Sequence, residues 1–147
     1  MALNGGLHIS GQDITFLAPL TISTAINATV TTPVKRLSGA NYLCVEAEFL
    51  YGSGGTTADA YIQTSLDNGL SWIDIMNFHF TTAAANKVSA VVATTALAAA
   101  VAPTDGSLTA NTILSGLFGS QYRLKYVTTG TYAGATSLAV YGVIQNI

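Results

Sequence analysis

Apolar and polar residues alternate with a period of two along several stretches of this 147-residue chain. In the clearest stretch, 41–52, one side of an extended backbone collects Leu43, Val45, Ala47, Phe49 and Tyr51. Successive side chains of a β-strand point to opposite faces of a sheet, so this pattern predicts a strand with one face in a core. The same alternation recurs in 58–66, 121–128 and 137–144, and we expect the last two to form a closing hairpin.

Weaker signals complete an all-β pattern. Strand-favouring residues also occupy 21–34, 72–75, 78–80 and 87–92. The sum of roughly seven to nine short strands with glycine-rich turns predicts a single antiparallel β-sandwich of jelly-roll-like type. Because alanine favours helices, one short helix within 93–118 stays open as an alternative.

The length of the chain suits one ordinary domain. Residues 1–19 combine three glycines and a proline with few apolar residues, which predicts an extended N-terminal arm, with residues 20–147 as the β-sandwich domain. An arm of this kind orders against a neighbouring subunit. The candidate interface residues are Leu3, Leu7, Ile9, Ile14, Phe16 and Tyr132.

Charge is scarce in this chain. Charged residues make up 8% of it, against about 25% in typical proteins. Small neutral polar residues desolvate at low cost, so this surface indicates a subunit of an assembly, with a β-rich monomer as the alternative. Five basic residues and a net charge of −2 argue against nucleic acid as a partner. No stretch approaches the roughly 18 apolar residues of a membrane span.

The residues that usually carry chemistry are dispersed. His79 lies between two phenylalanines without a metal-ligand spacing, so we expect it to face water or an interface. Glu46 and Glu48 share one strand face, which is typical of a solvated or interface-facing edge. Cys44 is the single cysteine and has no catalytic motif beside it, nor can it form an internal disulfide. We therefore expect no catalytic, metal or cofactor site, and no enzyme.

One octapeptide, "SLDNGLSW" at 65–72, concentrates a carboxylate, hydroxyls and the only tryptophan. An aspartate can accept hydrogen bonds from the amides of its own turn, and Asn-Gly tolerates positive φ. The stretch therefore predicts a structural hairpin turn, with the tryptophan ring covering it from the core. The residues of this turn are Ser65, Asp67, Gly69, Ser71 and Trp72. Their spacing resembles the Asp-box, Ser-x-Asp-x-Gly-x-Thr-Trp, with serine at the threonine position.

A wider resemblance joins this turn to the C-terminal third. The runs "YIQTSLDNGLSWIDIMNFHFTTA" at 61–83 and "DGSLTANTILSGLFGSQYRLKYVTTGTYAGATSLAVYG" at 105–142 resemble small virion-associated proteins of tailed bacteriophages and prophages. The quoted motifs are structural rather than catalytic. The resemblance implies a virion protein without indicating which part of the particle holds it.

The resemblance and the composition together favour a non-enzymatic structural subunit of a tailed-phage virion. The leading hypothesis is a capsid decoration (cement) protein that binds the major capsid protein and copies of itself, with a trimer as one form, after assembly in the bacterial cytoplasm. A tail, neck or head–tail connector subunit is the first alternative. A carbohydrate-binding module on the virion surface, using exposed tyrosines, is the second.

Overall fold

The computed structural model describes residues 12–36 and 40–146, with the backbone alone for 30–36. This part of the chain is built from strands and contains no helix. The strands are β2 (Gln12–Thr21), β3 (Ile26–Arg36), β4 (Tyr42–Leu50), β5 (Ser53–Gly54), β6 (Thr57–Ser65), β7 (Ile73–Phe80), β8 (Ala85–Val92), β9 (Gln121–Thr129), β10 (Tyr132–Ala133) and β11 (Ser137–Gln145).

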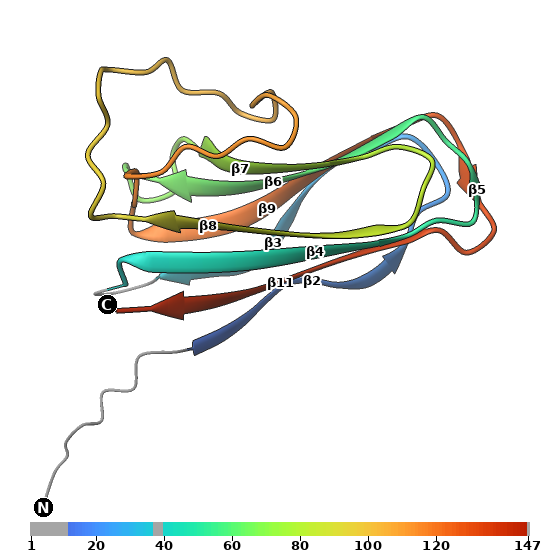
Figure 1. Ribbon diagram of the computed structural model, residues 1–147, viewed down its shortest axis with the longest axis horizontal. Coiled ribbons are helices and arrows are strands. Elements are labelled where there is room, and N and C mark those ends of the chain that lie inside the picture. Colours follow the sequence, from blue (N-terminus) through green and yellow to red (C-terminus); the bar gives the residue numbers. More distant parts are fainter. Residues whose placement is uncertain (1–11, 37–39, 147) are drawn as a thin grey trace, which may run out of the picture.

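Two four-stranded antiparallel sheets pack face to face (Figure 1). Their strand orders are β2-β11-β4-β8 and β3-β9-β6-β7, and the short β5 and β10 pair at one end. The chain changes sheet at every connection between these eight long strands except the one from β6 to β7. This order is that of a jelly roll, so the predicted all-β sandwich is confirmed.

The core lies between the two sheets and is made by the alternation seen in the sequence. The inward side chains of β4, from Leu43 to Phe49, are buried, and β6 faces them with Ala58, Ala60 and Ile62. The Phe49 and Phe80 rings stack with centroids 5.0 Å apart and so join the sheets. Strands were expected at 41–52, 58–66, 121–128 and 137–144, and each of these stretches contains one.

The second half of the expected N-terminal arm belongs to the sandwich. Gln12–Thr21 is the edge strand β2, which pairs with β11 along most of its length. Ile14 and Phe16 are 3% and 2% exposed and belong to the core of their own chain, so they are not free interface residues. Gly142 on the neighbouring strand β11 has no side chain, which leaves room for the Phe16 ring. A Cβ at position 142 would lie 2.9 Å from that ring. Leu3, Leu7 and Ile9 lie outside the described residues.

The expected closing hairpin is wrong, because β9 and β11 belong to opposite sheets. Tyr132 in the connection between them is buried, and its hydroxyl donates to the carbonyl of Thr81 at 2.9 Å. Its ring fills the space beside Gly55, where a Cβ would overlap it. Tyr132 therefore closes one end of the core rather than offering an interface.

The possible helix within 93–118 is absent as well. This stretch belongs to a long irregular connection from β8 to β9, drawn in yellow to orange in Figure 1. It runs along the edge strands β7 and β8: Leu114 N donates to Ile75 O at 2.8 Å, and Gly116 N to Val92 O at 2.9 Å. The run of alanines is exposed and offers no apolar face to bury. Pairing with two open strand edges therefore outweighs alanine's helix propensity.

Replacing Phe16 with alanine tests whether β2 belongs to the domain. We expect Phe16→Ala to lower the free energy of unfolding by about 3–5 kcal/mol, the cost of removing a buried phenylalanine ring. Urea denaturation measures this change. Thr15→Val, on the exposed side of the same strand, is the matched control and should change it by less than about 0.5 kcal/mol. Equal, small effects of both variants would mean that β2 does not contribute to the core.

Candidate functional site

The octapeptide forms the turn between β6 and β7. The Asp67 carboxylate accepts hydrogen bonds from Ser71 N at 2.8 Å, Ser71 Oγ at 2.6 Å and Ser65 Oγ at 2.9 Å. Ser65 Oγ in turn accepts from Gly69 N at 2.7 Å. Asn68 and Gly69 have φ of 62° and 91°, the left-handed values that Asn-Gly tolerates. The Asp67 carboxylate thus binds groups of its own turn.

These contacts also set the acidity of Asp67. Hydrogen bonds from the Ser71 hydroxyl and amide, and then from Ser65, favour the charged form and lower its pKa from 3.8 to about 2. The carboxylate therefore stays ionised through the ordinary pH range. Such a group holds a turn better than it transfers a proton near neutral pH.

Trp72 does not enter the core as expected. It is half-buried, and the Arg123 guanidinium carbon lies 4.4 Å from the centre of its ring, a cation–π contact. Arg123 belongs to β9, on the outer face of the β3-β9-β6-β7 sheet. Trp72 therefore packs on the outside of the sandwich, between the turn and this sheet.

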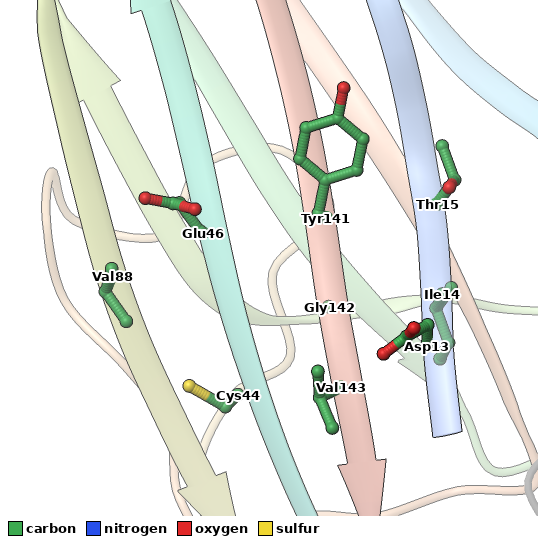
Figure 2. Close-up of a pocket in the computed structure, with 9 residues that line it drawn as sticks. All are labelled: Asp13, Ile14, Thr15, Cys44, Glu46, Val88, Tyr141, Gly142 and Val143. Carbon is green, nitrogen blue, oxygen red and sulfur yellow. The ribbon is translucent and has the colours of Figure 1, made fainter. Parts of the chain in front are cut away.

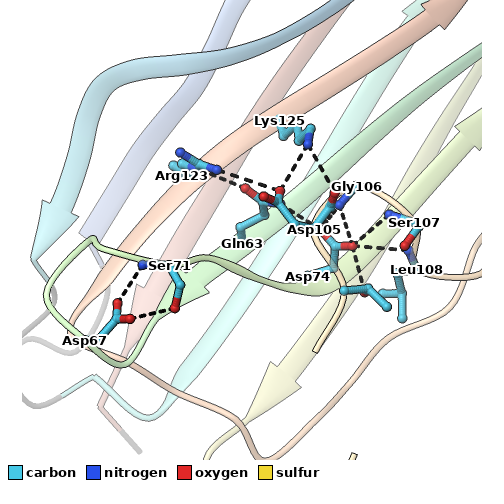
Figure 3. Close-up of polar contacts among 11 residues, drawn as sticks. Gln63, Asp67, Ser71, Asp74, Asp105, Gly106, Ser107, Leu108, Arg123 and Lys125 are labelled. Atoms are coloured by element: carbon cyan, nitrogen blue, oxygen red, sulfur yellow. Dashed lines mark hydrogen bonds and ion pairs between the residues drawn. The ribbon is translucent and has the colours of Figure 1, made fainter. Parts of the chain in front are cut away.

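Asp74 is the fully buried charge of this region, at 0% exposure. Backbone amides of residues 106–108 donate to its carboxylate at 2.8–3.1 Å, and Thr104 Oγ1 and Gln63 Nε2 donate at 2.8 Å each (Figure 3). Amide groups from a loop thus replace the water that a carboxylate loses on burial. Asp74 fastens the β8–β9 connection to the sheet.

Asp105, on the same connection, brings in two cations. Its side chain is 53% exposed, and its Oδ1 accepts from Gln63 Nε2 at 2.7 Å and Lys125 Nζ at 3.1 Å. Arg123 donates from Nε to Gln63 Oε1 at 2.7 Å and lies 3.8 Å from Asp105. Partial burial opposes the charge of Asp105, but the Gln63 and Lys125 hydrogen bonds and both cations lower its pKa. Burial lowers the pKa of Arg123, and the nearby carboxylates of Asp105 and Asp74 counteract this shift.

His79 takes part in a similar tie farther along β7. Its Nδ1 lies 2.8 Å from Asp59 Oδ1, and both side chains are partly buried. Its amide and Lys87 Nζ both donate to Asn111 Oδ1, at 3.0 and 2.9 Å, and Lys87 also donates to the His79 carbonyl. Asn111 belongs to the β8–β9 connection. The His79 ring thus binds Asp59 on the neighbouring strand β6 and stays partly exposed, while its backbone holds the loop through Asn111.

The outer face of the β2-β11-β4-β8 sheet differs from these clusters because no described segment of the chain covers it. A groove of about 510 Å³ runs across it, which we call the outer groove (Figure 2). Cys44 and Glu46 of β4 line this groove. Tyr141, which lies opposite Glu46 on β11, lines it as well. The sequence pattern placed Glu46 on the outward side of its strand together with Glu48 but gave no indication of Tyr141 and Asp13. Knowing which strands pair would have supplied them.

No protein-family model matches the sequence, and no curated protein matches it significantly. Among the described residues, no group of three or more His, Cys, Asp or Glu side chains is placed to hold a metal ion. The same part of the chain has no helix long and apolar enough to cross a membrane. The similarity to phage proteins therefore remains a prediction.

The pKa of Asp67 can be measured directly by NMR titration of its carboxyl carbon. We expect a value of about 2, which Ser71→Ala should move back toward 3.8. Because the folded pKa is depressed, the stabilisation by this turn is present above pH 4 and is lost as pH falls through about 2. An unshifted pKa in the wild type would show that the turn does not hold the charge.

Asp74→Asn tests the anchor of the long connection. An amide nitrogen cannot accept the bonds of the carboxylate, so we expect the free energy of unfolding to fall by about 3 kcal/mol or more. Hydrogen exchange at residues 106–108 should accelerate. The matched control is Asp105→Asn, at a half-exposed site, which should cost about 1 kcal/mol or less. Equal costs for the two variants would contradict the anchoring role.

Proposed function

We propose that this protein is a non-enzymatic structural subunit of a tailed-bacteriophage virion, and that it acts as a decoration protein on the head. In this role it binds the major capsid protein at many equivalent positions and stabilises the shell through repeated contacts. Its partners are the capsid protein and further copies of itself. It is assembled in the bacterial cytoplasm and ends on the particle surface.

One observation carries this proposal: the described polar clusters hold the chain together, while no described segment covers the outer face of one sheet. Asp67 binds its own turn, and Asp74, Asp105 and His79 fasten the β8–β9 connection. The outer face of the β2-β11-β4-β8 sheet has no such cover among the described residues. A building block needs this division between internal ties and a free contact surface.

Fold and composition support the same proposal. Jelly rolls occur in viral capsid proteins, and also in lectins, so the fold favours a structural or a glycan-binding role without deciding between them. The glycan alternative relied on exposed tyrosines. Tyr61, Tyr122 and Tyr132 are buried, which removes three of the seven from any stacking platform. The small number of charges lowers the cost of covering the surface on assembly.

The copy number of this protein in purified virions tests the proposal. We expect quantitative mass spectrometry to find it at a copy number approaching that of the major capsid protein, and labelled antibodies to mark the head in electron micrographs. A few copies per particle, located on the tail, would instead support the tail, neck or connector alternative. Absence from the particle would overturn the structural role.

A further inference from the structure

The outer groove has an apolar floor. Cys44 and Val143 are neighbours across β4 and β11 and form part of this floor. Tyr141 and Glu46 occupy the next pair of positions along the same two strands. Val88, opposite Glu46 on the edge strand β8, is 63% exposed and extends the apolar surface to the edge of the sheet. Such a surface is suited to contact with another protein.

The charges around this groove have one sign. Four aspartates have partners of their own chain: Asp59, Asp67, Asp74 and Asp105. The other three acidic residues, Asp13, Glu46 and Glu48, lie on the outer face of the β2-β11-β4-β8 sheet without an ion pair to any described residue. The groove is therefore flanked by negative charge that the described part of the chain leaves uncompensated.

The basic residues are placed elsewhere. Lys87, Arg123 and Lys125 bind groups of β7, β6 and the β8–β9 connection. Lys35 and Arg36 belong to β3, in the opposite sheet. A basic partner would therefore complement the charge of the outer face. Two copies meeting through this same face would bring like charges together, which argues against a face-to-face dimer.

Lysine and arginine side chains match the outer groove in two ways, through an aliphatic stem and a positive charge. Their aliphatic stems cover apolar surface while the charged ends reach out to carboxylates. A stem lying over Val143 and Cys44 would place its charge between Glu46 and Asp13. Nucleic acid and anionic lipid, which carry the same sign as the groove, are disfavoured.

We propose that the outer groove is the docking surface of this subunit, and that its occupant is a basic segment of the major capsid protein. The segment lays a lysine or arginine side chain across the groove, next to apolar residues that contact Val88. This inference rests on the proposed decoration role and names the surface and the partner chemistry that serve it.

The test uses virions from a phage whose gene for this protein has been deleted. Purified wild-type protein is added back, and bound protein is measured after sedimentation at low and at high salt. We expect the triple variant Asp13→Asn, Glu46→Gln, Glu48→Gln to bind about tenfold more weakly or worse, and to lose most of the salt dependence. Because these carboxylates have no ion-pair partner among the described residues, the variant should melt like the wild type.

A matched control changes charge on the other sheet. Asn27→Lys, at an exposed position of β3, makes the protein more positive by one unit, as Glu46→Gln does. We expect Asn27→Lys to bind like the wild type and Glu46→Gln to bind more weakly. Equal weakening by the two variants would mean that overall charge, rather than the outer groove, governs docking.

The remaining outcomes separate this inference from the proposed function. Equal binding of the wild type and the triple variant to heads would refute the groove as the docking surface and leave the decoration role intact. Binding to isolated tails but not to heads, or to neither, would refute the decoration role and the capsid partner together. Self-association of the free protein that the triple variant abolishes would identify a second copy as the occupant and overturn the capsid segment.

Discussion

The buried carboxylate of Asp74 is the interaction on which the outer part of this structure depends. A charge without exposure to water is tolerable only if donors surround it, and here most of the donors come from a loop 30 or more positions away in sequence. Asp74 thus turns a long connection without regular structure into a fixed part of the fold. The same connection then covers the edges of β7 and β8, which would otherwise offer unpaired backbone groups to other chains.

This arrangement gives the two sheets different roles. The β3-β9-β6-β7 sheet has polar side chains on its outer face, such as Gln63 and Arg123, and these bind the loop, the turn and Trp72. On the β2-β11-β4-β8 sheet, outer side chains such as Glu46 and Tyr141 bind no loop or turn of the described part of the chain. The described ties to the loop and the turn therefore lie on the outer face of one sheet and not on that of the other.

The strands could be predicted from the sequence, but their partners could not. Alternation in β4 and β11 indicates which side of each strand is buried, because a core on one face selects for apolar residues at every second position. It does not indicate which strand lies alongside, so β9 and β11 were assigned to one hairpin although they belong to opposite sheets. β2 was missed because its two buried residues, Ile14 and Phe16, are too few to outweigh the glycines before it.

The candidate sites divide in the same way. The hydrogen bonds of the Asp67 carboxylate are local, all within four residues, so its motif could be interpreted directly. The contacts of Asp74 with 104–108 and of His79 with Asn111 join distant, irregular segments, and no periodic pattern marks them. Trp72 was placed in the core because large aromatic rings usually lie there. Its position just after the turn directs it toward Arg123 instead.

The place of β11 has a consequence for how the chain is made. β11 is the last described strand in sequence, yet it lies between β2 and β4 in the middle of its sheet. While the ribosome is still producing residues before Ser137, β2 lacks β11, the strand with which it pairs in that sheet. A hairpin of β6 and β7 can form early, but the sandwich can close only after Ser137–Gln145 has left the ribosome. Synthesis therefore passes through a stage at which unpaired strand edges are open to neighbouring chains, and the exposure lasts until β11 is in place.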